Sequence, residues 1–174
     1  EGVTRQYRDY PLHEVSAAID HLKTLGLYRE VEMTNVPTGK ETTSSLFGYV
    51  QGAFTGAEHN TNGAIADWCE KSRNSYKALK TSRPSSLEGW VVLDEVGDLP
   101  LEAQGKLLHL LQHGAFIPYG GTEEHRTYVR QRFILCTNKN LEQMVADKEF
   151  REDLLARIQT FHIHLPPLAE QGLT

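Results

Sequence analysis

The spacing of apolar residues along the chain alternates between helical and strand periods. Over residues 11–25, apolar positions recur every three or four residues, which predicts a helix with one buried face. Residues 27–36 alternate apolar and polar side chains, which predicts a half-buried strand. The short apolar runs at 90–93 and 132–137 are typical of strands that are covered on both faces.

Further helices are predicted between and after these strands. The apolar positions of residues 100–113 favour a helix that ends at Gly114, and shorter helices are expected near 141–147 and 150–158. Because strands and helices alternate, the predicted fold class is α/β, a parallel sheet with flanking helices and right-handed crossovers. Residues 165–168 contain two prolines and are expected to be extended.

Composition places the chain among soluble globular domains. It has 174 residues, a net charge of -5 and two cysteines, which suit a single domain in a reducing cytoplasm. The excess of acidic residues argues against a protein that binds mainly to nucleic-acid phosphates. No apolar run approaches the ~20 residues that span a bilayer, and the first residues do not resemble a secretion signal, so no membrane association is expected.

Residues 67–89 are polar and mixed in charge, and they end in a stretch rich in Ser, Arg and Pro. This composition predicts a solvated linker or insertion inside one domain that spans residues 1–174. The basic residues of the segment also permit a contact with DNA or polymerase, an alternative that the mixed charge favours less.

Two consecutive carboxylates follow the apolar run at 90–93. Ligands of open parallel sheets bind beyond the carboxyl ends of the strands, so Asp94 and Glu95 are candidates for a nucleotide site. Asp94 would hold a hydrated Mg²⁺ there, and Glu95 would orient or deprotonate an attacking water. The alternative is that Asp94 caps the next turn and that Glu95 is merely solvated.

The strand predicted at 132–137 is followed by Asn138. An amide at that position could detect the terminal phosphate of a nucleotide through a hydrogen bond. It could equally cap the helix that begins near Leu141.

The segment Gly52-Ala53-Phe54-Thr55-Gly56-Ala57 has no charge, and its two glycines permit a tight reversal of the chain. An aromatic side chain at the tip of such a loop exposes apolar surface unless it docks on something. From these residues alone, Phe54 is expected to fold back into the core.

Together with Leu46-Phe47-Gly48, this loop resembles the signature loop of bacterial enhancer-binding proteins, the AAA+ activators of sigma-54 RNA polymerase. Further segments match motifs of that family in the family's order: 92–100, which is similar to Walker B, then 104–111, 120–122, 137–138, 150–154 and 165–168. One six-residue motif is weak evidence. An ordered set across residues 46–58 and 90–171 is specific for the sigma-54 interaction domain.

The resemblance implies an ATPase that acts as a homo-oligomeric ring, usually a hexamer, and opens the promoter complex formed by the sigma-54 RNA polymerase holoenzyme. Residues 52–57 would be the loop that contacts sigma-54, with Phe54 and Thr55 at its tip.

The resemblance also assigns the nucleotide site. Asp94 and Glu95 would be the Walker B pair that serves ATP and Mg²⁺, with Asp94 holding the metal through water. Asn138 would occupy the sensor I position. Asn35 loosely matches a family Asn that restrains the catalytic glutamate.

Arg151 and Arg157 match the arginine fingers of the family, which reach the nucleotide of a neighbouring subunit. A planar guanidinium suits the stabilisation of developing phosphoryl charge. Six residues on one ideal helix place the two about 120° apart, so both can serve one phosphate only if Arg151 lies at the helix start. Without the resemblance, both would be interpreted as surface arginines of an amphipathic helix.

The chain also departs from the family pattern. No segment matches the P-loop that cradles phosphates. Residues 38–41 mimic the end of a P-loop, but they lie too late in the order of motifs to replace it. No segment matches the C-terminal helical lid. We therefore expect a partial domain that is inactive as an ATPase in isolation, with DNA contacted only through domains outside this chain.

Two histidine pairs have spacings that occur in metal sites. His109 and His113 are four residues apart, and His162 and His164 are two apart. Leu110 replaces the catalytic Glu of the zinc protease motif that the first pair resembles, and the second pair has no evident third ligand, so no metal is expected at either one.

Two functions from different classes fit these observations. The first is the central segment of a sigma-54-dependent transcriptional activator, an ATPase when whole. The second is a truncated or degenerate interaction module that keeps the sigma-contacting loop but does not bind ATP. A third, an AAA+ remodeller unrelated to sigma-54, is disfavoured by the signature loop.

Overall fold

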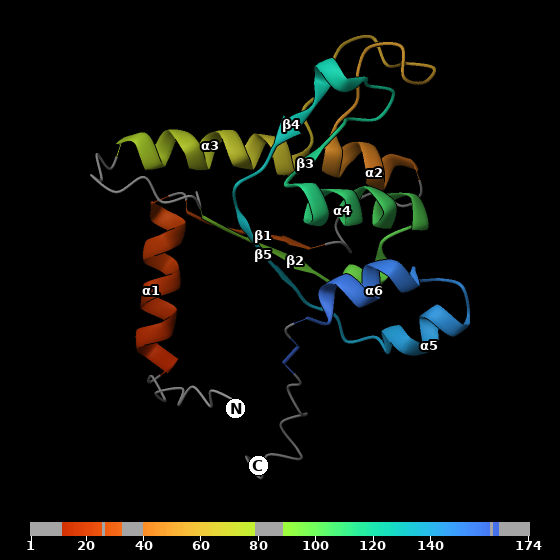
Figure 1. The fold of residues 1–174 in the computed structure, drawn as a ribbon. Helices are drawn as coiled ribbons and strands as arrows, with labels where there is room; N and C mark the ends of the chain where they lie inside the picture. Colours follow the sequence, from red (N-terminus) through yellow and green to blue (C-terminus); the bar gives the residue numbers. More distant parts are fainter. Residues whose placement is uncertain (1–11, 26, 33–39, 79–88, 161, 164–174) are drawn as a thin grey trace.

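The computed structural model describes residues 12–25, 27–32, 40–78, 89–160 and 162–163. A parallel sheet of three strands lies at its centre, in the order β1 (Tyr28–Glu32), β2 (Trp90–Asp94) and β5 (Arg132–Leu135) (Figure 1). Since parallel strands need a crossover, helices separate β1 from β2 and β2 from β5 in the chain. The predicted α/β class with a parallel sheet and flanking helices is confirmed.

The helices and the minor strands complete the described architecture. The helices are α1 (Leu12–Thr24), α2 (Lys40–Phe47), α3 (Ala64–Ala78), α4 (Leu101–His113), α5 (Leu141–Ala146) and α6 (Glu152–Ile158). Short β3 (Ala115–Phe116) and β4 (Thr127–Tyr128) pair antiparallel, and single 3-10 turns span Val96–Asp98 and Glu123–His125. Gly114 ends α4 in the left-handed conformation, with φ of 62°, as predicted.

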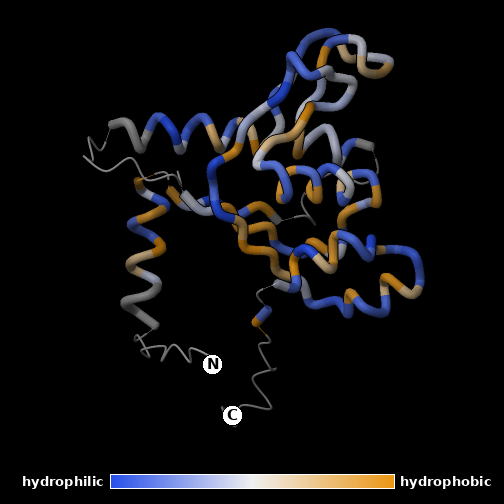
Figure 2. The backbone as a smooth tube through the Cα atoms, viewed as in Figure 1, coloured by the Kyte–Doolittle hydropathy of each residue, from blue (hydrophilic) through white to orange (hydrophobic). Residues whose placement is uncertain are grey.

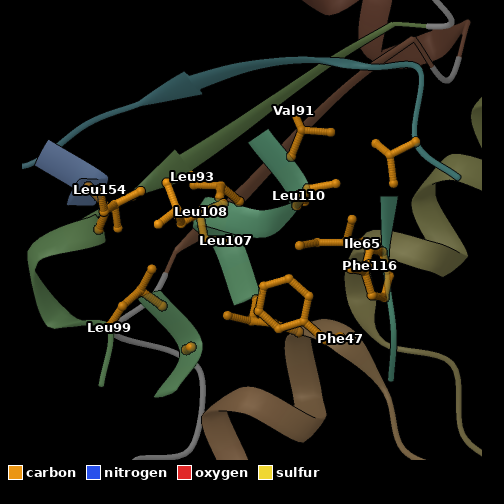
Figure 3. Packing of buried hydrophobic residues seen from close by; sticks show 14 of the residues in the cluster. Phe47, Ile65, Val91, Leu93, Leu99, Leu107, Leu108, Leu110, Phe116 and Leu154 are labelled. Carbon is orange, nitrogen blue, oxygen red and sulfur yellow. The ribbon is translucent and has the colours of Figure 1, made fainter. Parts of the chain in front are cut away.

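The core lies between the sheet and helices α2, α3, α4 and α6. Side chains alternate along β2, so Val91 and Leu93 point together into this core, where each is about 1% exposed. The buried face of α4 supplies Leu107 and Leu110, and Leu154 of α6 closes the cluster (Figure 3). Apolar segments accordingly concentrate at the sheet and the faces of α4 and α6 that meet it (Figure 2).

β5 differs from the prediction for its segment. Residues 132–137 were expected to form a strand covered on both faces, but Arg132 and Ile134 are exposed while Phe133 and Leu135 are half-buried. The reason is position, because β5 is the edge of the described sheet and pairs only with β2. A strand at such an edge can leave one face uncovered by the described helices.

The polar segment beginning at residue 67 also differs from prediction. A solvated loop was expected, but residues 64–78 form α3. Ile65, Trp68 and Cys69 lie in the core, and Ser72 is fully buried one turn later. The helix forms because these positions share one face at helical spacing, which the surrounding charges masked. Residues 79–88 lie outside the described residues, and the insertion proposed for 67–89 stays a prediction.

None of the helices in the described ranges combines the length and the apolar character needed to cross a bilayer.

Candidate functional site

Asp94 is the last residue of β2, and the chain turns sharply immediately after it. Glu95 adopts the left-handed conformation, with φ of 58° and ψ of 47°. A glutamate pays a steric cost there, and such strain is typical of functional turns. The backbone N–H of Glu95 donates to Asp94 Oδ1 at 3.1 Å, which holds the first carboxylate against the turn. Both carboxylates are half-buried at the carboxyl end of the sheet.

The loop that follows β5 packs directly on this acidic turn. Asn138 N–H donates to Glu95 Oε2 at 3.3 Å, so the sensor I candidate and the candidate catalytic glutamate lie side by side. Val96 N–H donates to the Cys136 carbonyl at 2.9 Å. Lys139 Nζ lies 2.5 Å from Asp98 Oδ1, an ion pair that joins the two loops. The structure therefore brings three predicted residues together at one site.

Gly97 explains how closely the two loops approach each other. A Cβ built on Gly97 lies 2.9 Å from Thr137 Oγ1 and 3.0 Å from Lys139 Cδ. A side chain at this position would require the Thr137 and Lys139 side chains to shift, because their atoms lie closer than a normal contact. Gly97 and the Lys139–Asp98 pair were missed in the sequence. Their roles arise only once β2 and β5 are neighbours.

Asn138 does not cap the following helix, so that interpretation was wrong. The cap of α5 is Asn140, whose Oδ1 accepts a hydrogen bond from Gln143 N–H at 2.9 Å. Asn138 stays two residues earlier, in the loop beside Glu95, with its side chain exposed.

The negative charges at this edge of the sheet affect the pKa of the Cys136 thiol. Burial is the main cause that raises the pKa of its thiol, and the negative charges of Asp94, Glu30 and Glu95 raise it further. The thiol is therefore less reactive than an ordinary cysteine at neutral pH. The same concentration of negative charge favours a cation, and carboxylate oxygens are the ligands that Mg²⁺ prefers. The residues present thus fit the predicted metal role of Asp94.

The two candidate arginine fingers flank α4. Arg151 is the N-cap of α6, with extended φ and ψ of -78° and 127°, so it lies at the helix start as the finger interpretation requires. Its guanidinium makes a bidentate ion pair with Asp153, and its Nη1 lies 3.6 Å from a Cβ built on Gly105. Arg157 instead donates from Nη2 to the Leu111 carbonyl at 2.9 Å.

The signature loop forms a closed turn at the opposite end of the molecule, beside the β3–β4 segment at the top of Figure 1. Gly52 N–H donates to the Ala57 carbonyl at 2.9 Å, and Ala57 N–H donates to the Phe54 carbonyl at 3.0 Å. Gly52 and Gly56 have φ of 80° and 95°, conformations that glycine adopts without strain. Ala57 is buried and anchors the loop, while Thr55 is exposed at its tip.

Phe54 is 44% exposed and does not fold back into the core, so that expectation was wrong. Its ring rests on Tyr49 at a centroid distance of 4.9 Å and faces Tyr119 at 6.3 Å. Tyr49 N–H donates to Thr61, and Tyr119 N–H donates to the Gly48 carbonyl at 2.9 Å, which fixes this aromatic support. No pattern in the sequence marks Tyr119, which reaches the loop only through the tertiary fold.

The remaining candidate residues either lie outside the described residues or form no site. Asn35 and residues 38–39 lie outside the described residues, and Lys40 and Glu41 begin α2. His109 and His113 stack at 4.3 Å, with each Nδ1 on a backbone carbonyl. His162 is exposed, and His164 lies outside the described residues. No cluster of three or more metal-binding side chains occurs among the residues described.

Comparison with known proteins identifies the family of this chain. The sequence model of the sigma-54 interaction domain matches residues 20–70 and 81–164. The formate hydrogenlyase transcriptional activator FhlA of Escherichia coli K12 is 43% identical over 128 residues, which are 74% of this chain and 16% of that protein. The transcriptional regulator NtrC of the same strain is 39% identical over 129 residues, 74% of this chain and 23% of that protein.

A solved structure shares the fold. NtrX from Brucella abortus, in complex with ADP, aligns with a TM-score of 0.63 and 29% identity over 90% of this chain and 30% of that one. The fold is therefore the α/β core of an AAA+ protein. Within that class, the chain belongs to the sigma-54 interaction domain family, as the resemblance predicted. It spans about a sixth to a quarter of the length of the curated relatives named above.

Proposed function

We propose that this chain is the central segment of a sigma-54-dependent transcriptional activator. In this proposal, residues 52–57 contact sigma-54 in the RNA polymerase holoenzyme, and DNA is bound through domains outside this chain. The observation that carries the proposal is the exposed Phe54, supported from below by Tyr49 and Tyr119 in a chain of this family. An aromatic ring on a fixed support is suited to a protein interface, because little further ordering is needed on binding.

The activity of the complete domain is proposed to be ATP hydrolysis in a cytoplasmic homo-oligomeric ring, most simply a hexamer. Asp94 would hold Mg²⁺ through water, and the metal supplies charge neutralisation on the phosphates when bound. Glu95 would orient the attacking water, and its Oε2 accepts from Asn138 N–H at 3.3 Å. This bond uses the backbone N–H of Asn138, and its side-chain amide would detect the terminal phosphate of the nucleotide.

Arg151 and Arg157 are proposed to act on the nucleotide of the neighbouring subunit. Arg151 makes a bidentate ion pair with Asp153, and its side chain is exposed, as contact with a neighbouring subunit requires. Arg157 is exposed on the same short helix and is held by the Leu111 carbonyl. In a ring these guanidinium groups would neutralise developing phosphoryl charge in trans.

Sigma-54 binding tests the proposal. The wild-type chain should retain purified sigma-54 in a pull-down, and Thr55→Ala should reduce the retained amount several-fold because the exposed hydroxyl at the loop tip is lost. Gln112→Ala is the matched control, since Gln112 is also exposed but lies on α4, away from the loop. Equal retention by the wild type and Thr55→Ala, or no retention by either, contradicts the proposal.

The isolated chain is proposed to bind ATP weakly or not at all, because none of its segments has the P-loop pattern. Calorimetric titration with ATP and Mg²⁺ should give no saturable heat at micromolar concentrations. Micromolar, Mg²⁺-dependent binding would overturn this prediction, and it would assign phosphate binding to residues without that pattern.

The second candidate is a nonhydrolytic interaction module that keeps the sigma-contacting loop. The same lack of a P-loop pattern favours it. The two candidates separate on the coding sequence upstream of Glu1: a P-loop encoded there supports the ATPase, and a start codon immediately before Glu1 supports the module.

A further inference from the structure

Gln104 is a fully buried glutamine in α4 that joins two other segments of the chain. It is 0% exposed. Its Nε2 donates to the Leu99 carbonyl at 2.7 Å and to the Glu149 carbonyl at 3.0 Å. Its Oε1 accepts the backbone N–H of Arg151 at 2.9 Å. Both amide protons and the carbonyl oxygen are thus used within the protein.

These bonds connect the two halves of the proposed nucleotide machinery. Leu99 ends the turn that starts at the candidate catalytic Glu95, with Asp98 N–H bonded to the Glu95 carbonyl at 2.9 Å. Arg151 is the candidate finger and the N-cap of α6. Its backbone N–H precedes the helix, so α6 itself offers it no carbonyl partner. Gln104 supplies that partner and so fixes the backbone from which the guanidinium projects.

A buried glutamine is uncommon, because each of its polar atoms loses water and must find a hydrogen-bond partner within the protein. Gln131 is another buried glutamine, but its hydrogen bonding is less complete. It is 7% exposed and accepts from Cys69 Sγ and Arg130 N–H, each at 3.0 Å, but its Nε2 has no partner among the described residues. Of these two glutamines, only Gln104 connects the acidic turn to the segment that carries Arg151.

We propose that Gln104 is a positioning residue for the arginine finger: its side-chain amide holds Arg151 in register with the acidic turn of residues 94–99. This inference rests on the proposed function, in which Arg151 acts on a neighbour's nucleotide. The amide does so by bonding both segments at once, so the finger and the turn keep a fixed separation within one subunit.

The test compares Gln104→Met with Gln131→Met in this chain. Both variants replace a buried glutamine by an apolar side chain of similar length. The readouts are the amide hydrogen exchange of Arg151, the order of its Nε–Hε group by NMR relaxation, and the thermal midpoint. Gln104→Met should speed exchange at Arg151 by about tenfold or more and loosen Nε–Hε, whereas Gln131→Met leaves both unchanged.

Gln104→Glu separates the two kinds of bond. An ionised carboxylate still accepts from the Arg151 N–H but cannot donate to the Leu99 or Glu149 carbonyl, so amide exchange at Arg151 should be slower in Gln104→Glu than in Gln104→Met. Unchanged Arg151 signals in Gln104→Met, or equal loosening in Gln131→Met, would overturn the inference.

Sigma-54 retention measured on the same variants keeps the two proposals apart. None of the hydrogen-bond partners of Gln104 belongs to the loop of residues 52–57, so its variants should retain sigma-54 as the wild type does. Absent retention by the wild type, with normal Arg151 order, contradicts the proposed function and leaves the positioning of Arg151 intact.

Discussion

Gly48→Ala should lower the free energy of unfolding by about 3 kcal/mol, from backbone strain together with overpacking. Gly48 has φ of 75°, and a Cβ built on it lies 2.3 Å from the Thr61 carbonyl oxygen and 2.6 Å from Gly63 N. Both neighbours are backbone atoms, so relief requires the base of the signature loop to open. Urea unfolding monitored by circular dichroism measures the effect, with the m-value expected to stay constant.

Gly56→Ala is the matched control for that measurement. Gly56 has φ of 95° but no described heavy atom within 4 Å of an added Cβ, so this variant reports conformational strain without a clash. We expect a loss of about 1 kcal/mol. Equal losses in the two variants would show that close packing at Gly48 does not contribute.

Phe54→Ala should weaken the binding of sigma-54 by about 2 kcal/mol, or roughly 30-fold in Kd. The ring is the exposed part of the aromatic group that Tyr49 and Tyr119 support. Its removal takes away contact area without disturbing the core, so the free energy of unfolding should change little. Biolayer interferometry with immobilised sigma-54 gives the affinity.

Tyr128→Ala is the control for Phe54→Ala, since Tyr128 is a 63% exposed aromatic residue on the neighbouring β4 strand. It should change Kd by less than about twofold if the loop itself makes the contact. A larger loss in Tyr128→Ala than in Phe54→Ala would move the interface from the loop to β4.

The three strands of the central sheet and helices α1, α4, α5 and α6 could be predicted because the spacing of their apolar residues marks them. The helix at 101–113 and its end at Gly114 follow from spacing and from the conformational freedom of glycine. α3 was missed because polar and charged residues separate the positions of its buried face, which Ile65, Trp68, Cys69 and Ser72 mark. The composition of this segment is mostly polar, so composition alone does not reveal the narrow buried face of α3.

The residue types of the site could be predicted, but the backbone conformations and tertiary contacts that hold them could not. Asp94 and Glu95 were recognisable as an acid pair after a strand. The left-handed conformation of Glu95 was not, since glutamate has no preference for it and the surrounding loops hold it there. The residues around Phe54 did not predict its exposure, because its partner Tyr119 is distant in sequence and reaches it only through the fold; the family resemblance did place it at the loop tip.

The central claim, that the loop of residues 52–57 contacts sigma-54, is tested most directly by site-specific photocrosslinking. A photoreactive amino acid placed at position 55, at the exposed tip of the loop, should crosslink to sigma-54 on irradiation. The same group at position 112, exposed on α4, should give no crosslink. Crosslinking from position 112 alone, or from neither position at saturating sigma-54, would contradict the account.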